Sequence, residues 1–154
     1  MFISTIGYEG SEISDFVSVL KYAGVEALVD IRDLPSSRKP GFSKNSLSAS
    51  VAKAGSEYIH VKPLGDPREG RLAARAGNMT KFRKIFCEHI SSPEGKTALY
   101  FVANLAKGKK ICLMCFERDH KFCHREIVVQ ELLKIQLVQV KHIGVPKGFS
   151  LEAA

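Results

Sequence analysis

The sequence has no tryptophan, only four cysteines in 154 residues, and no apolar run near the ~20 residues that span a bilayer. It contains no repeat and no low-complexity tract, and its first residues lack the basic and apolar regions of a signal peptide. Four cysteines are too sparse for a secreted domain held by disulfides. These absences exclude a membrane protein, a coiled coil and a disulfide-rich mini-protein, and we expect a cytoplasmic protein.

The composition is that of an ordinary globular domain. Apolar residues make up 45% of the chain and charged residues 25%. A chain of this length buries roughly two thirds of its unfolded surface, so it needs neither a disulfide nor a metal to fold. We therefore expect one domain over residues 1–154, while the oligomeric state stays open.

Apolar segments alternate between strand-like and helix-like patterns. Strands are predicted over residues 2–7, 25–31, 57–61, 110–116 and 137–143, and helices over residues 11–24, 43–55, 80–90, 93–107 and 123–133. Strands separated by helices predict a single three-layer α/β domain with a mostly parallel sheet of about five strands and helices on both faces. Residues 62–78 show no periodicity and are predicted to be a long loop, which is more often functional than decorative.

Positive charge is concentrated in one segment. The chain carries a net charge of +7, and the segment Lys62–Lys84 holds seven basic and two acidic side chains. Such a concentration attracts a nucleic acid or a phosphorylated ligand. The alternative is a solvated basic surface without a partner.

Polar and ionisable residues follow the predicted strands at their carboxyl ends, where parallel sheets bind their ligands. They are Tyr8 and Glu9 after the first strand, Asp30, Arg32 and Arg38 at the second, His60 at the third, and Cys115, Glu117, Cys123, His124 and Arg125 around the fourth.

The segment D-I-R-D-L-P-S-S-R-K-P-G-F, residues 30–42, is a candidate anion site. Arg32 and Arg38 can grip a phosphate or a carboxylate with two hydrogen bonds each. Alternatively, Asp30 and Arg32 pair with their neighbours and the prolines only shape a loop.

The segment C-L-M-C-F-E-R-D-H-K-F-C-H-R-E, residues 112–126, brings thiols and imidazoles together. Cys112 and Cys115 lie three positions apart on a predicted strand and therefore face opposite sides of the sheet. We expect Cys112 in the core, and Cys87, on an apolar helix, as well. Cys123 opens a helix, where free N–H groups favour a thiolate.

Three interpretations of this segment stay open. In the first, Cys115 or Cys123 is a thiolate nucleophile, with His124 or His120 as its base and Glu117 orienting that base. In the second, Cys115, Cys123 and one of these histidines hold zinc, although paired C-x-x-C knuckles are missing. In the third, the segment only packs at the sheet edge.

Taken together, these segments resemble the domain of unknown function 488 family. The motifs that carry the resemblance are T-I-G-Y-E-G (5–10), L-V-D-I-R-D-L-P-S-S-R-K-P-G-F (28–42), Y-I-H-V-K-P-L-G (58–65) and L-M-C-F-E-R-D-H-K-F-C-H-R (113–125). The resemblance implies a cytosolic α/β domain with no firmly established reaction. It also implies that the sheet-edge residues named above are functional residues. The sequence departs from the family where Asp66-Pro67 follow Leu64-Gly65 in place of another glycine. This departure puts in doubt whether the loop after Gly65 has the conformation of the family's lid loop.

A weaker similarity is to rhodanese-type sulfurtransferases and thiol phosphatases, in which a D-x-R strand precedes a cysteine loop. Here the loop after Cys115 is longer and contains Glu117 and Asp119, which oppose anion binding.

We expect an enzyme, a hydrolase or transferase, that acts on a phosphorylated substrate (nucleic acid or nucleotide) at the C-terminal edge of the sheet. Substrate binding is expected from Tyr8, Asp30, Arg32, Arg38, His60 and Arg125. Catalysis is expected from Glu117, Glu9, Cys115, Cys123 and His124. The sequence requires no cofactor, and zinc is the metal alternative. The other function classes are a non-catalytic module that binds a nucleic acid or a protein partner through Lys62–Lys84, and rhodanese-like thiol chemistry.

Overall fold

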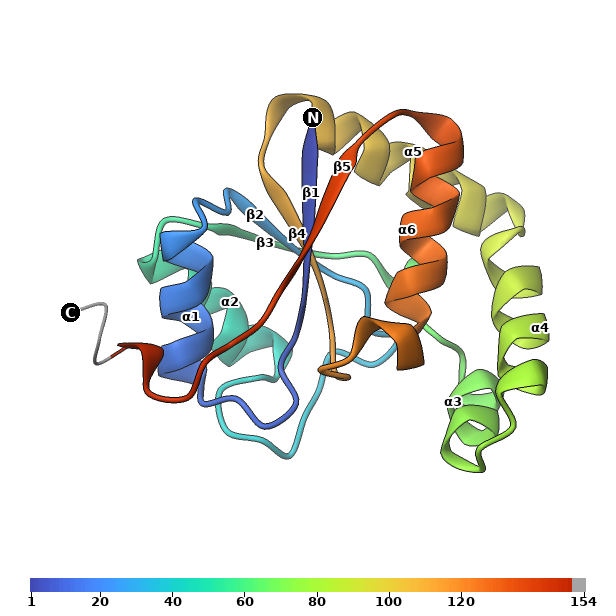
Figure 1. Ribbon diagram of the computed structural model, residues 1–154, viewed down its shortest axis with the longest axis horizontal. Coiled ribbons are helices and arrows are strands. Elements are labelled where there is room, and N and C mark those ends of the chain that lie inside the picture. The colour runs from blue at the N-terminus through green and yellow to red at the C-terminus, as the bar shows by residue number, and fades with distance from the viewer. Residues whose placement is uncertain (151–154) are drawn as a thin grey trace.

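Five parallel strands form one sheet in the computed structural model, which describes residues 1–150 (Figure 1). The strands are β1 (Phe2–Gly7), β2 (Ala27–Asp30), β3 (Glu57–His60), β4 (Ile111–Cys115) and β5 (Gln139–Ile143). Their order is β3-β2-β4-β1-β5, and every neighbouring pair is parallel. The predicted α/β fold is therefore confirmed. The expected domain end at residue 154 lies outside the described residues.

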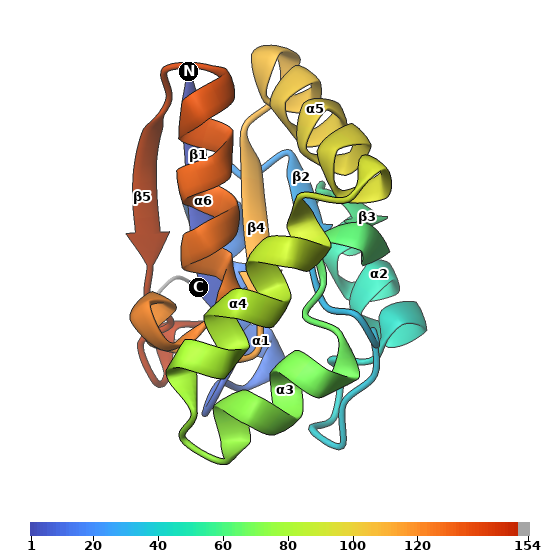
Figure 2. The same ribbon diagram turned by 90° about the vertical axis from the view of Figure 1, so that its right-hand side faces the viewer.

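Helices cover both faces of the sheet. Helices α1 (Ile13–Tyr22) and α2 (Lys44–Lys53) lie on one face, and α4 (Met79–Ile90), α5 (Pro93–Gly108) and α6 (His124–Ile135) lie on the other (Figures 1 and 2). Helix α3 (Arg68–Arg75) contacts α4 below this second layer, and two short 3-10 turns, η1 (Lys62–Leu64) and η2 (His120–Phe122), precede α3 and α6. No helix of residues 1–150 is long and apolar enough to cross a membrane.

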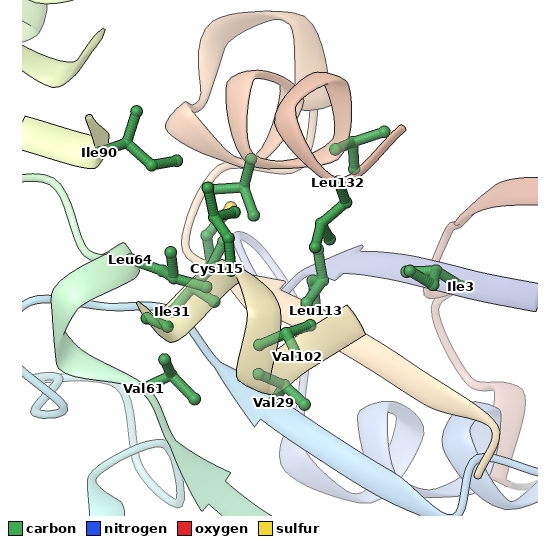
Figure 3. Packing of buried hydrophobic residues seen from close by; sticks show 14 of the residues in the cluster. Ile3, Val29, Ile31, Val61, Leu64, Ile90, Val102, Leu113, Cys115 and Leu132 are labelled. Carbon is green, nitrogen blue, oxygen red and sulfur yellow. The ribbon is translucent and has the colours of Figure 1, made fainter. Parts of the chain in front are cut away.

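Successive side chains along each strand point to opposite faces of the sheet and belong to two separate hydrophobic cores. Val29 and Leu113 point to the layer of α4, α5 and α6, where they pack with Val102 (Figure 3). Their chain neighbours Leu28 and Met114 point the other way, toward α1 and α2. All five side chains are fully buried. Full burial of such a side chain stabilises the fold by about 1.5–3 kcal/mol, so the alternation fixes the register of each strand.

The cysteines divide between these cores in a way that the sequence predicted only in part. Cys112 is fully buried toward α1 and α2, as expected, and Cys115 is buried on the opposite face. Cys87 was expected in the core, but it is exposed. On α4 the inward positions are Phe82 and Phe86, spaced by four residues, and Cys87 follows one position beyond that stripe.

The prediction of a long loop over residues 62–78 is wrong for its central part, which forms α3. Pro67 is the extended N-cap residue of this helix, and Gly77 follows it with a positive φ of 77°. A proline before and a glycine after are the usual helix boundaries, and R-L-A-A-R between them is a good helix former. The frequent prolines and glycines of the segment hid this short helix.

The topology creates a place for a ligand at one edge. The chain leaves β1 and β2 for α1 and α2 on one face, but it leaves β3 and β4 for helices on the other face. Because β4 lies between β2 and β1, its connection diverges from those of both neighbours. Ligands in open parallel sheets bind outside the carboxyl ends of strands that diverge in this way.

Candidate functional site

A pocket of about 560 Å³ lies at this divergence. Its lining includes Tyr8 after β1, Arg32 and Asp33 after β2, Phe116 and Glu117 after β4, and Asp66, Arg71 and Arg75 before and on α3. The size suits a small organic ligand such as a nucleotide. The predicted convergence of charged residues at the carboxyl edge therefore has a cavity at its centre.

Arg32 reaches this pocket as part of a buried ion pair with Asp30. Its Nε and Nη2 donate to the Asp30 carboxylate at 2.9 and 2.8 Å, and Nη1 donates to the carbonyl of Phe42 at 2.7 Å and to the hydroxyl of Tyr8 at 3.2 Å. The Tyr58 hydroxyl completes the shell of Asp30 at 2.5 Å.

This network limits what Arg32 can do for a substrate. A guanidinium has five N–H donors, and these contacts leave one N–H of Nη2 free. Burial opposes the charge of Arg32, but Asp30 outweighs it and raises the pKa of Arg32. The pair is neutral overall, so Arg32 offers one directed hydrogen bond and no net charge.

Two further arginines enter the pocket from α3. Arg71 donates to Asp33 and to the carbonyl of Asp66, both at 2.8 Å. Arg75 also lines the pocket, and its guanidinium has no ion-pair partner within residues 1–150. Neither residue was predicted individually as a site residue, but both belong to the Lys62–Lys84 segment that was expected to attract a phosphorylated ligand. Their spacing of four on a helix places them on one face.

Two carboxyl groups of the pocket hold protons unusually tightly. Asp66 is 6% exposed, and its Oδ1 is buried without a hydrogen-bond partner. Burial raises the pKa of Asp66 to about 7, with Glu117 and Asp33 acting in the same direction and Arg71 opposing. Burial also raises the pKa of Glu117. A carboxyl group with a pKa of about 7, such as Asp66, transfers protons near neutral pH.

Asp66 was not among the predicted site residues, although it stands at the departure from the family pattern. The carboxylate lies against Gly70, where an added Cβ would meet its Oδ1 at 1.9 Å. The missing side chain of Gly70 is what makes room for Asp66 beneath α3.

The thiols of Cys115 and Cys123 come together beside the pocket. The structure pairs their sulfur atoms, and their Cα atoms are 7.5 Å apart, whereas disulfides usually hold Cα atoms about 4.4–6.8 Å apart. The ligand atoms of Cys115, Glu117 and Cys123 lie within 4.8 Å of one another, in a set that does not include His124. If this site holds zinc, Glu117 replaces the expected histidine as the third ligand.

His124 contacts Cys123 from one side of its ring. Its Nε2 lies 2.7 Å from the carbonyl of Ile31, and its Nδ1 lies 3.5 Å from Sγ of Cys123. Burial lowers the pKa of His124 to about 4, so the ring is neutral at pH 7. Since a carbonyl only accepts, Nε2 carries the hydrogen and Nδ1 is left as an acceptor for the thiol.

Besides Asp30, Cys115 and Cys123, four more predicted site residues lie at the edge but outside the pocket lining. Arg38 is exposed and makes no ion pair within residues 1–150, and Glu9 accepts from the backbone N–H of Arg118 at 3.0 Å. His60 donates to the carbonyl of Arg32 at 2.7 Å. Arg125 is 1% exposed, and it donates to the carbonyl of Glu117 at 3.1 Å. The last two contacts hold the pocket-lining backbone in place.

A second group of possible metal ligands consists of His120, Glu126 and His142. The imidazole rings of His120 and His142 are parallel within 2°, with their centroids 3.5 Å apart. A ring nitrogen directs its lone pair in the ring plane, so two stacked rings cannot point at one ion. This group is therefore better described as two stacked histidines beside the carboxylate of Glu126 than as a metal site.

Comparison with known proteins adds one finding. The sequence model of a family described as "Domain of unknown function DUF488" matches residues 12–132, which is most of the chain. Neither the curated proteins nor the solved structures compared with this sequence gave a match.

Proposed function

The chain belongs to the domain of unknown function DUF488 family, and we propose that it is an enzyme acting on a phosphorylated substrate, a nucleotide or nucleic acid, in the pocket at the carboxyl edge of the sheet. We place this activity in the cytoplasm, which suits the exposed thiol of Cys87. The observation that carries the proposal is Asp66, a buried carboxyl with a pKa of about 7, in the same pocket as Arg75, which forms no ion pair within residues 1–150.

Phosphate binding follows from the arginines of α3. Arg75 brings a positive charge that no carboxylate of residues 1–150 neutralises by an ion pair. Arg71 shares its charge with Asp33, and Arg32 adds its remaining N–H. An arginine fork matches the oxygens of a phosphate and binds them with charge-assisted hydrogen bonds.

The rest of the pocket suits a flat organic group. Phe116 and Phe122 line it from the two ends of the segment that joins β4 to α6, and Leu34 and Met79 add apolar surface. Phe122 is 63% exposed, so its ring is open to a partner. A nucleobase stacks on such aromatic rings, which favours a nucleotide unit over a simple phosphate.

Asp66 is the group that we assign to proton transfer. At pH 7 a carboxyl with a pKa of about 7 is half protonated, so it can give a proton to a leaving oxygen or take one from an attacking water or hydroxyl. Glu117, whose pKa is also raised, faces the same space and is the second candidate. Transfer to water would make the protein a hydrolase, and transfer to another hydroxyl would make it a transferase.

The test is turnover of nucleotides, phosphodiesters and single- and double-stranded oligonucleotides by the full chain. Asp66→Asn should lower kcat by roughly 10²–10⁴, the usual contribution of general acid–base catalysis. Arg75→Gln should raise KM roughly tenfold or more, since a hydrogen bond to a charged group contributes about 1.5–3 kcal/mol. Glu88→Gln and Arg83→Gln, both on the exposed side of α4 and outside the pocket lining, are the matched controls. Equal activity of Asp66→Asn, Arg75→Gln and wild type would overturn the proposal.

A non-catalytic nucleic-acid module is the second candidate. Exposed basic residues of the Lys62–Lys84 segment support it, because several of them, such as Arg68, Lys81 and Arg83, form no ion pair within residues 1–150. This function predicts binding that weakens steeply with salt. It also predicts that Arg83→Gln weakens binding while Asp66→Asn does not, which is the reverse of the pattern expected for the enzyme.

A further inference from the structure

The thiol of Cys123 has the surroundings of a reactive cysteine. Cys123 is the N-cap residue of α6, and its Sγ accepts the backbone N–H of Arg125 at 3.4 Å. The acceptor Nδ1 of His124 lies 3.5 Å from the same sulfur. The N–H groups of a helix start stabilise a thiolate, and the backbone N–H of Arg125 is one of these groups.

A second thiol stands next to it. Cys115 ends β4, is fully buried, and is paired with Cys123 in the structure. The other two cysteines offer a contrast within the same chain. Cys87 is exposed on α4, and Cys112 lies in the opposite core, where burial raises its pKa to about 12.

We infer that Cys123 and Cys115 form a redox-active pair, in which Cys123 attacks a peroxide and Cys115 resolves the product to a disulfide. This activity is separate from the phosphoryl chemistry proposed above and rests on different residues. The pair would be reduced again by a dithiol.

The chemistry balances with the peroxide as the two-electron oxidant. The Cys123 thiolate attacks one peroxide oxygen, the O–O bond breaks, and hydroxide leaves and is protonated to water. The sulfenic acid of Cys123 is then attacked by the Cys115 sulfur. The S–O bond breaks, the S–S bond forms, and a second water carries away the hydroxyl with the Cys115 proton. The proton that the Cys123 thiol gives up is the one that converts the leaving hydroxide to water, and Nδ1 of His124, 3.5 Å from Sγ, orients the thiol as a hydrogen-bond acceptor.

The pair is coupled to the pocket by the chain between the two cysteines. This segment carries Phe116, Glu117 and Phe122, all of which line the pocket. Oxidation is therefore expected to change the pocket.

The test uses the reduced full-length protein, treated with hydrogen peroxide in the presence of dimedone, followed by peptide mass spectrometry. Wild type should lose the mass of two hydrogens and yield a Cys115–Cys123 cross-linked peptide. Cys115→Ser should instead collect the dimedone adduct at Cys123. Cys123 should be oxidised roughly tenfold faster than Cys87, despite its burial, because the thiolate is the reactive form and the start of a helix favours it. Cys123→Ser should leave Cys115 unmodified.

Three results would overturn the inference. One is oxidation of Cys87 ahead of Cys123, and another is equal oxidation of Cys115 and Cys123 when the other is replaced by serine. The third is a purified protein in which a bound metal protects both thiols until a chelator is added. None of these measurements involves a phosphorylated substrate, so failure here leaves the proposed function unaffected. The cross-linked Cys115–Cys123 peptide is measured on the wild-type protein, so the test holds even if a cysteine variant fails to fold.

Discussion

Arg32 donates from Nε and Nη2 to the two carboxylate oxygens of Asp30, two positions earlier in the chain, and both side chains are buried. The two charged side chains of the D-x-R motif therefore pair with each other at the end of β2. Its arginine is fixed within the fold before any ligand arrives. The main role of the motif is therefore structural, and only the remaining N–H of Arg32 Nη2 is available to bind a ligand.

Replacing Arg32 should cost stability as well as any binding. Arg32→Gln leaves the carboxylate of Asp30, which is fully buried, without its charge partner. Removal of one member of a buried ion pair typically costs about 3–5 kcal/mol. Urea unfolding followed by circular dichroism measures the loss. The double variant Asp30→Asn/Arg32→Gln should be less destabilised than the sum of the single variants, and a single variant as stable as wild type would show that the pair does not support the fold.

The sequence predicted the architecture better than the site. The periodicity of the apolar residues led to the correct α/β fold, because it follows directly from which residues are buried. The neighbours Leu28 and Val29 of β2, for example, are buried on opposite faces of the sheet. The carboxyl-edge rule also placed Tyr8, Arg32 and Glu117 at the pocket. Asp66 was missed, and Arg75 was predicted only as one of the basic residues of Lys62–Lys84, because their place in the pocket depends on α3 folding over the edge and, for Asp66, on the space left by Gly70. No local pattern encodes such a contact.

Asp66 should make the protein less stable as the pH rises. Its pKa is about 7 in the folded protein and 3.8 in the unfolded chain. Between these values the folded state binds more protons than the unfolded state, so the free energy of unfolding falls as the pH rises from about 4 to 7. Solvent at the pocket limits the size to about 1–3 kcal/mol. Asp66→Asn should remove this contribution, so in urea titrations its free energy of unfolding should rise relative to that of wild type as the pH rises, and it should be more stable than wild type at pH 8. A variant with an unchanged pH profile would contradict the raised pKa.

His124 should produce a slope of the opposite sign. Its pKa is about 4 when folded and 6.5 when unfolded, so the unfolded chain binds the extra proton between these values. Its contribution to stability is present above pH 6.5 and is lost as the pH falls toward 4. His124→Gln, whose amide can still donate to the carbonyl of Ile31, should remove this loss. Because Asp66 acts oppositely over nearly the same range, wild type should be flatter than either variant, and parallel profiles of all three proteins would refute both assignments.

Gly7 should be intolerant of even one methyl group. An added Cβ would lie 1.8 Å from the carbonyl oxygen of Glu117, so the ends of β1 and β4 must stay in close backbone contact. Gly7→Ala should therefore destabilise the protein by about 1–3 kcal/mol, the usual cost of overpacking, and displace Glu117 from its place at the pocket. Gly108, at the end of α5, is the matched control, since an added Cβ meets nothing within 4 Å. Gly108→Ala should stabilise the protein by about 0.4–1 kcal/mol, because alanine restricts the unfolded chain. Urea unfolding of both variants separates the two effects. If both alanines raised stability alike, the segment after β4 could not lie where the pocket requires it.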